Sequence, residues 1–329
     1  MAKLRLHIHN STLKADVFHI TEARWRGAAA RHAGLARKLE ASIGWDGAGL
    51  DDALAQADIV IGVPAERDRL RERAPRLRWL HHTSAGVDSL LPLDWLPRGV
   101  AFTNNHGAHG AKAEQYMRMA YTLLNVRLPR IVANQRAHRW EQVFSGNLVG
   151  QTALVIGLGD LGEAAARAAR QLGLRVIGVR RHGKPCRYAD SVHTYRSLDR
   201  LLPKADYVVL AVPLTAETRN LLDRRRLDLL RPTAAVINIA RGPVADHAAL
   251  ADKLRAGELA GAVLDVVEPE PLPPDSPLWD TPNLVITPHV SCDDADNYVG
   301  LSLDLWFENL ARFVDGRPLR RRVNARLGY

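Results

Sequence analysis

The stretch "ALVIGLGDLGEAAARAARQLGLRVIGVRR", residues 153 to 181, places a glycine pattern between two apolar runs. Gly157, Gly159 and Gly162 form G-x-G-x-x-G after the first run and before an Ala-rich segment. In a βαβ unit these glycines permit a tight turn, close approach of peptide N–H groups to a pyrophosphate, and close packing of helix on strand. The stretch therefore predicts a dinucleotide-binding unit, and the residues that start its helix, Asp160 and Leu161, join the predicted phosphate site.

The second strand of this unit ends in Arg180 and Arg181, where an NAD site usually has an acid that binds the adenosine ribose. Arginine cannot accept those hydrogen bonds, but its guanidinium can hold a 2'-phosphate through charge-assisted contacts. The sequence thus predicts NADP as the preferred cofactor, with NAD possible. The alternative is that both arginines simply face solvent.

Beyond residue 151, short apolar runs alternate with segments of helical apolar spacing, which is typical of a parallel sheet covered on both faces. The first hundred residues repeat this theme in smaller form, with β-like runs at 58–63 and 77–86. Long amphipathic patterns lie at 111–127 and 302–316. We therefore expect an α/β protein with two Rossmann-like domains, both built on doubly wound parallel sheets.

Three residues follow three of the apolar runs. Arg241 comes after "AAVINIA", Glu270 after "AGAVLDVV" and His289 after "NLVITP". Ligands of open α/β sheets bind beyond the carboxyl ends of the strands, so we expect these side chains to share one crevice. They supply a guanidinium for a carboxylate, an acid, and an imidazole that exchanges a proton near neutral pH.

The composition and charge of the chain indicate whether a nucleic acid or a membrane is an expected partner. The chain has 329 residues, of which 47% are hydrophobic, and a net charge of +9. Its basic clusters, such as "RRR" at 224–226 and 320–322, are short and scattered, so we expect no nucleic-acid partner. No apolar run reaches 18 residues and the N-terminus has no hydrophobic signal region, which predicts a cytoplasmic protein without a membrane span.

The cysteines and histidines give no metal signature in the sequence. Cys186 and Cys292 are too few for a disulfide framework, and we expect both to be reduced thiols. The motif "HGAHG" at 106–110 itself contains no acidic residue and no cysteine. We therefore interpret His81, His82, His106 and His109 as ordinary loop histidines and predict no metal site.

Several longer motifs together carry a family resemblance. "GLGDLG", "AVPLTAETRNLLD", "NIARGPVADHAAL", "GAVLDVVEPEPLPPDSPLWDTPNLVITPHV" and "TSAGVDSLLP" are similar to those of the D-isomer-specific 2-hydroxyacid dehydrogenases, in particular the glyoxylate/hydroxypyruvate reductases. The resemblance extends from about residue 80 to the final "GY". The first eighty residues carry no family motif.

The resemblance implies a domain arrangement and an assembly. It implies a discontinuous, flavodoxin-like substrate domain made of residues 1–103 and 291–329, and a dinucleotide-binding Rossmann domain at 104–290. It also implies a homodimer with a small 2-oxo or 2-hydroxy acid as substrate, bound in the interdomain cleft.

The resemblance further implies residue roles. Arg241 would bind substrate, Glu270 would pair with the histidine, and His289 would be the acid and base. Gly86 and Val87 would offer peptide N–H groups to the substrate carboxylate. The positions that would line the nicotinamide end of the cofactor site are Val212, Pro213, Ile239 and Asp265.

The activity that the resemblance implies is reduction of a 2-oxo acid. Glyoxylate and hydroxypyruvate are the expected substrates, because NADP-linked relatives commonly reduce them. Arg241 would hold the carboxylate, and His289, oriented by Glu270, would give a proton to the forming alkoxide. Two alternatives stay open. One is an NAD-linked dehydrogenase of another small 2-hydroxy acid, and the other is a cofactor-sensing scaffold that resembles the C-terminal-binding-protein corepressors.

Overall fold

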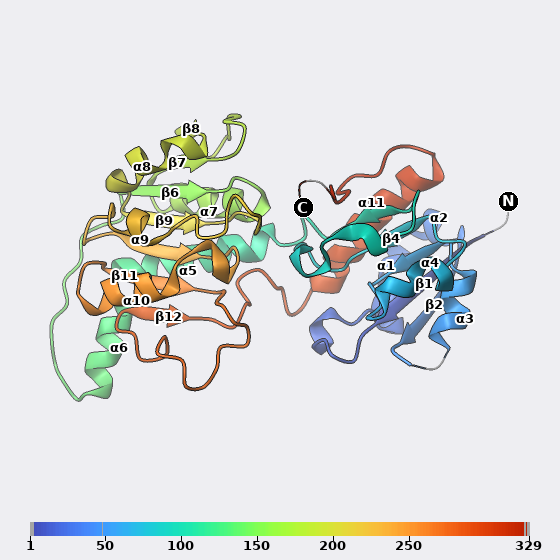
Figure 1. Cartoon of the computed structure of the whole chain (residues 1–329), viewed down its shortest axis with the longest axis horizontal. Helices are drawn as coiled ribbons and strands as arrows, with labels where there is room; N and C mark the ends of the chain where they lie inside the picture. Colours follow the sequence, from blue (N-terminus) through green and yellow to red (C-terminus); the bar gives the residue numbers. More distant parts are fainter. Residues whose placement is uncertain (1–2, 48, 326, 328–329) are drawn as a thin grey trace. The chain divides into compact units, whose positions relative to one another are not determined.

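The computed structural model describes residues 3–47, 49–325 and 327, which form two compact units (Figure 1). Unit 1 combines Met1–Ala108 with Asp294–Tyr329, and unit 2 is the continuous segment His109–Asp293. Each unit has its own parallel sheet, so the expected α/β class with two Rossmann-like domains is confirmed. Within the described residues, no helix is both long and apolar enough to cross a bilayer.

Unit 2 is built on a seven-stranded sheet in the order β12-β11-β10-β9-β6-β7-β8, and all of its pairings are parallel. Figure 1 shows the strands stacked in this order. The strands are β6 Thr152–Ile156, β7 Arg175–Val179, β8 Ser191–His193, β9 Tyr207–Leu210, β10 Ala235–Asn238, β11 Gly261–Leu264 and β12 Leu284–Ile286.

Helices cover both faces of this sheet. Because successive side chains of a strand point to opposite faces, one strand contributes to two separate apolar clusters. Leu154 and Ile156 of β6 join one apolar cluster with residues of α8, α9 and α10, whereas Ala153 and Val155 join another with residues of α5 and α7. The helices of unit 2 are α5 Gly110–Asn125, α6 Leu128–Arg136, α7 Asp160–Gln171, α8 Leu198–Leu201, α9 Arg224–Leu227 and α10 His247–Arg255, with 3-10 turns η5 Tyr195–Ser197, η6 Leu202–Lys204 and η7 Gly242–Val244.

Unit 1 has a five-stranded parallel sheet in the order β2-β1-β3-β4-β5, which is the flavodoxin-like strand order. Its strands are β1 Leu4–Asn10, β2 Leu39–Trp45, β3 Ile59–Ile61, β4 Trp79–His81 and β5 Ala101–Thr103. Its helices are α1 Glu22–Arg31, α2 Ala33–Ala36, α3 Leu50–Gln56, α4 Leu70–Arg73 and α11 Tyr298–Val314, with 3-10 turns η1 Asp16–Phe18, η2 Arg67–Arg69, η3 Asp88–Leu90 and η4 Leu93–Trp95.

The C-terminal helix α11 completes the core of unit 1. Trp306 of α11 stacks on Trp79 of β4 with ring centroids 5.2 Å apart, and Phe307 stacks on Trp25 of α1 at 5.5 Å. These aromatic side chains are buried, with Leu6 and Ile8 of β1 in the same cluster. One face of the sheet therefore depends on a helix whose Trp306 lies 227 positions beyond Trp79 in the chain.

Candidate active site

The predicted phosphate loop has the geometry that a dinucleotide needs. Gly157 has φ +96°, and a Cβ there would collide with the carbonyl oxygen of Ala211. A Cβ on Gly162 would collide with the carbonyl oxygen of Gly157. Helix α7 begins directly after Gly159, whose lack of a side chain leaves the first N–H groups of the helix uncapped. Only glycine fits these contacts, and the loop fits a bound pyrophosphate.

Arg180 and Arg181 follow β7 at the same edge of the sheet. The peptide N–H of Arg180 donates to the carbonyl of His193 at the end of β8. The guanidinium of Arg181 lies 3.2 Å from a carboxylate oxygen of Glu217, an exposed residue of the loop after β9. The same loop contains the buried Val212 and the exposed Pro213. The arginines thus lie beside the strand ends, with Arg181 held by an ion pair.

Glu270 and His289 form a direct pair. The Nδ1 atom of His289 is 2.9 Å from Oε2 of Glu270, and Oε1 of Glu270 accepts a hydrogen bond of 3.0 Å from the N–H of Val267. With its Nδ1–H donating to the carboxylate, His289 has Nε2 free to exchange a proton. Both side chains keep more than a third of their surface exposed, so a small molecule can reach the imidazole.

Asp265 fixes the loop that carries His289. This carboxylate is buried and accepts hydrogen bonds from the hydroxyl of Thr287 at 2.6 Å, from the N–H of Val290 at 2.9 Å and from the N–H of Ser291 at 3.1 Å. The N–H of His289 donates to the carbonyl of Asp265, and His289 has φ +56°. Sequence reasoning assigned Asp265 to the nicotinamide end and missed this anchoring role, which depends on contacts 22 to 26 residues away.

Arg241 follows β10, the strand between β9 and β11 in the sheet, so the strands that precede the three candidate catalytic residues are neighbours. The side-chain amide of Asn238 donates to the carbonyl of Arg241 at 3.1 Å. Ile239, between them, is buried. A Cβ on the next residue, Gly242, would collide with the carbonyl of Val267, which draws this turn against the segment before Glu270. Arg241, Glu270 and His289 are thus all brought to one edge of unit 2.

Gly86 and Val87 belong to a loop of unit 1 that follows β4. The side-chain amide of Asn104 holds this loop by donating to the carbonyl of Ala85 at 2.7 Å, and the N–H of Asn105 donates to the carbonyl of Ser84 at 3.2 Å. Within the described part of the chain, the peptide N–H groups of Gly86 and Val87 donate to no other residue. Two N–H donors on a braced loop can receive an anionic group of a ligand.

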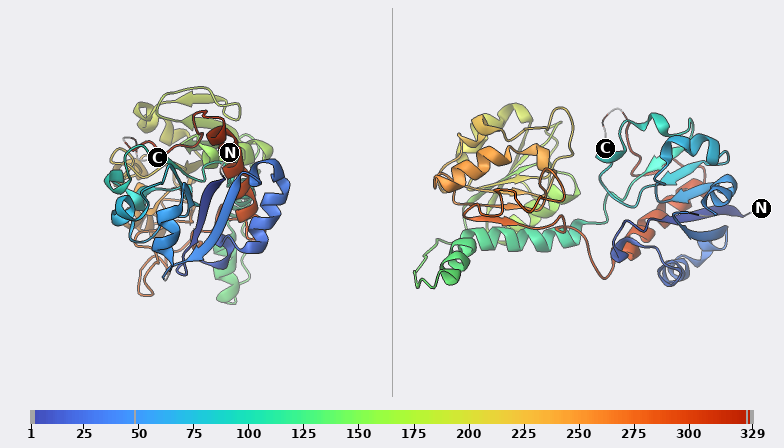
Figure 2. Two further views of the ribbon diagram at one scale, coloured as in Figure 1. Left: turned by 90° about the vertical axis from the view of Figure 1, so that its right-hand side faces the viewer. Right: turned by 60° about the horizontal axis from the view of Figure 1, so that its bottom comes forward.

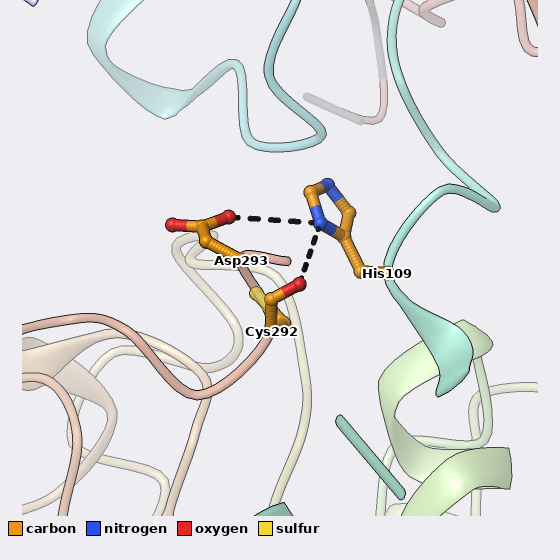
Figure 3. A group of neighbouring side chains, drawn as sticks. All are labelled: His109, Cys292 and Asp293. Atoms are coloured by element: carbon orange, nitrogen blue, oxygen red, sulfur yellow. Dashed lines mark hydrogen bonds and ion pairs between the residues drawn. The ribbon is translucent and has the colours of Figure 1, made fainter. Parts of the chain in front are cut away.

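The histidines differ from the sequence interpretation. His81 lies inside β4 and is buried, and His82 directly after it is also buried, so neither is an ordinary loop histidine. His109 has companions that the sequence hides: Cys292 and Asp293 lie beside it, 183 and 184 positions along the chain (Figure 3). Cys186 and Cys292 are both free thiols, as expected.

Comparisons with known proteins agree with this geometry. The family model described as "D-isomer specific 2-hydroxyacid dehydrogenase, NAD binding domain" matches residues 119–291. Glyoxylate reductase of Thermococcus gammatolerans is 32% identical over 287 residues, which are 83% of this chain and 84% of that protein.

Two solved structures extend the likeness to the whole chain. A D-isomer specific 2-hydroxyacid dehydrogenase of Xanthobacter autotrophicus Py2, in complex with NADPH and MES, has a TM-score of 0.85 at 31% identity and covers 100% of both chains. An NADPH-dependent glyoxylate/hydroxypyruvate reductase of Sinorhizobium meliloti, in complex with NADP and sulfate, has a TM-score of 0.84 at 27% identity and covers 99% of this chain and 100% of its own.

Proposed function

Because the chain belongs to the D-isomer specific 2-hydroxyacid dehydrogenases, we propose that it reduces glyoxylate or hydroxypyruvate with NADPH, using Arg241, Glu270 and His289. The observation that carries this proposal is the 2.9 Å contact between His289 Nδ1 and Glu270 Oε2 beyond the strand ends that also present Arg241. The names of the glyoxylate reductase relatives support the choice of substrate.

The residues of the site have separate tasks. The guanidinium of Arg241 pairs with the substrate carboxylate and polarises the 2-oxo group. The nicotinamide, when bound, supplies the hydride. His289 donates the proton on Nε2 to the alkoxide that forms, and Glu270 holds the imidazole ring by its Nδ1–H. We also propose that Gly86 and Val87 of unit 1 offer their N–H groups to a carboxylate of the substrate.

The preference for NADPH rests on Arg180 and Arg181. No acid stands at the end of β7, and two guanidinium groups there attract a 2'-phosphate, which carries about two negative charges. Arg181 already pairs with the exposed Glu217, a surface contact that contributes less than about 1 kcal/mol and is therefore easily exchanged for a phosphate.

A substrate panel with both cofactors tests this function. We expect kcat/KM for glyoxylate or hydroxypyruvate to be roughly tenfold or more higher with NADPH than with NADH, and the double variant Arg180→Ala, Arg181→Ala to lose most of that preference. Arg98→Ala, an exposed arginine of unit 1, is the control. A wild-type preference for NADH would favour an NAD-linked dehydrogenase, and tight cofactor binding without turnover of any 2-oxo acid would favour a scaffold.

We further propose that the protein is a cytoplasmic homodimer, whose partner covers the arm formed by α6 and the loop to residue 147. Figure 2 shows this arm extending beyond the end of α5. Trp140 is 98% exposed and Phe144 80% exposed, while Leu128 and Ile131 of α6 are also exposed apolar residues. Apolar side chains gathered on one projecting segment are typical of a protein interface.

The proposed dimer interface is tested by measuring the mass of the protein in solution. We expect sedimentation equilibrium to give twice the chain mass for the wild type and a single chain mass for the double variant Trp140→Ser, Phe144→Ser. Trp279→Ser, at another exposed tryptophan of unit 2, should leave the dimer intact. A monomeric wild type would contradict the proposed dimer. A double variant that dimerises with unchanged affinity would show that the interface lies elsewhere.

A further inference from the structure

Three potential metal ligands meet in unit 2 at the two ends of its chain segment. His109 is its first residue, and Cys292 and Asp293 are its last two. Figure 3 shows the imidazole of His109 turned toward both of them. Its Nδ1 atom lies 3.8 Å from Oδ1 of Asp293 and 3.3 Å from the carbonyl oxygen of Cys292. One ligand atom from each side chain lies within 4.8 Å of those of the other two.

We propose that His109, Cys292 and Asp293 form a binding site for a divalent cation of the zinc class. A thiolate, an imidazole and a carboxylate together suit Zn²⁺ or Co²⁺ rather than Mg²⁺ or Ca²⁺, which prefer oxygen ligands alone. Three protein ligands leave the fourth tetrahedral position to water. The proposal concerns a ligand other than the 2-oxo acid and does not depend on the reduction proposed above.

The backbone on both sides of the site is held before any ion binds. His109 precedes α5, and its carbonyl accepts the N–H of Ala113 in the first turn of that helix. The segment that leads to Cys292 is anchored by the buried Asp265, which accepts the N–H of Ser291 at 3.1 Å. A hydroxyl contact of 2.6 Å between Tyr116 of α5 and Thr287 ties the two segments together. Ion binding therefore requires ordering of side chains more than of backbone.

The distances need only a small adjustment. Zinc lies about 2.3 Å from a thiolate sulfur and about 2.0 to 2.2 Å from imidazole nitrogen and carboxylate oxygen, which places tetrahedral ligand atoms roughly 3 to 4 Å apart. The separation of His109 Nδ1 and Asp293 Oδ1, 3.8 Å, already falls in this range. Closing the longest separation, at most 4.8 Å, takes about 1 Å of side-chain movement.

The charges around the site favour a bound cation, and without one they disfavour the thiolate form of Cys292. Burial, together with the carboxylates of Asp293 and Asp265, raises the pKa of Cys292 to about 12, so without an ion the thiol keeps its proton. The same negative field attracts a dication, whose binding releases the thiol proton as the metal–sulfur bond forms. The opposing positive groups are Arg241 and, when protonated, His109 and His289.

Cobalt binding tests the site directly, because a thiolate bound to Co²⁺ gives a charge-transfer band in the near ultraviolet. Titration of the wild-type protein should produce this band with one Co²⁺ per chain, and Zn²⁺ should displace it. Cys186→Ser is the decisive variant, because the chain has only two cysteines. Retention of the band in Cys186→Ser identifies Cys292 as the ligand without altering the site.

The remaining ligands are tested by affinity. His109→Asn and Asp293→Asn should each weaken Co²⁺ binding at least tenfold, and Cys292→Ser should abolish the band, while thermal unfolding in the presence of a chelator confirms that each variant is folded. Absence of the band in the wild type, its loss in Cys186→Ser, or unchanged affinity in folded His109→Asn would overturn the proposal. Each of these readouts is independent of 2-oxo acid turnover.

Discussion

The two sheets share one architecture but differ in what their interiors contain. In unit 2 the central strands β6, β9, β10 and β11 carry no histidine, acidic or basic residue. In unit 1 the central strands β1 and β4 hold the buried imidazoles of His7, His9 and His81, and His82 follows directly. The interior of a sheet thus accepts imidazole groups as long as they stay neutral. Unit 1 should therefore lose stability at acidic pH, because protonated imidazole is disfavoured in its interior.

The cause is desolvation, which disfavours the charged form of a buried histidine. Burial, and then the charge of Arg321, lowers the pKa of His81 from 6.5 to about 3. Burial, followed by Lys14 and His81, lowers that of His82 to about 3, and burial followed by His9 lowers that of His7 to about 4. The acid and base chemistry that we propose, in contrast, uses residues at the exposed edge of unit 2. Stability toward acid and catalysis should therefore respond to different histidines.

The largest expected effect comes from His289→Asn. Asparagine tolerates the left-handed backbone at this position, φ +56°, so the loop should keep its shape while the proton donor is lost. Turnover of the 2-oxo acid should fall on the order of a hundredfold or more, with cofactor affinity and the acid-unfolding profile unchanged. Steady-state kinetics and fluorescence titration with NADPH measure both. Near-normal turnover would move the proton donor elsewhere.

An intermediate effect is expected for Asp265→Asn, which tests whether the edge of unit 2 depends on a buried charge. The amide offers one acceptor oxygen where the carboxylate receives three hydrogen bonds, so the loop carrying His289 should loosen. We expect a loss of about 1 to 3 kcal/mol in the free energy of unfolding and roughly tenfold in kcat. Urea unfolding and hydrogen exchange at residues 287–291 would show it. Asp275→Asn, at an exposed residue of unit 2, serves as the control.

The effect that is smallest near neutral pH concerns acid stability, and it tests the contrast most directly. The neutral form of His81 is favoured in the folded chain, so its contribution is complete above about pH 6.5 and is lost as the pH falls from there toward 3. In His81→Asn the free energy of unfolding should fall less steeply below pH 6.5, by about 1 kcal/mol per pH unit. His138→Asn, at an exposed histidine, should leave the slope unchanged.

Tryptophan fluorescence can follow this unfolding of unit 1 separately. Trp25, Trp79, Trp95 and Trp306 are buried in unit 1, whereas Trp140 and Trp279 of unit 2 are exposed already. A shift of the emission on unfolding therefore reports mainly unit 1. Equal slopes for wild type and His81→Asn would show that buried imidazoles do not set its acid stability.

The same difference explains which elements could be predicted. The apolar runs of unit 2 predicted β6, β7 and β9 to β12, because buried parallel strands are nearly continuous in apolar residues. Strands β1, β2 and β5 of unit 1 escaped prediction: β1, "LRLHIHN", mixes histidines with apolar residues, and β5 has only three residues. The segment "RRRLDLLRP" at 224–232 has helical apolar spacing, but α9 is a single turn of four residues.

The candidate site was predictable only in part. The positions of Arg241, Glu270 and His289 after strands could be read from the sequence, because parallel strands end at a shared edge. The anchoring by Asp265 could not, since it depends on how one carboxylate meets two peptide N–H groups and a hydroxyl. The contact of His109 with Cys292 and Asp293 could not be predicted either, because these two residues lie at the far end of the inserted segment.

The insertion of unit 2 between two parts of unit 1 also sets an order of folding during synthesis. Unit 2 is continuous, and its ends meet where His109 contacts Asp293, so its core is complete once residue 293 has left the ribosome. Residues 1–108 emerge first, yet Trp79 lacks its stacking partner until α11 supplies Trp306. A nascent chain therefore carries an exposed aromatic face through the synthesis of all of unit 2. Residues 1–108 are therefore synthesised before unit 2, but their core is completed only after it, when α11 has been made.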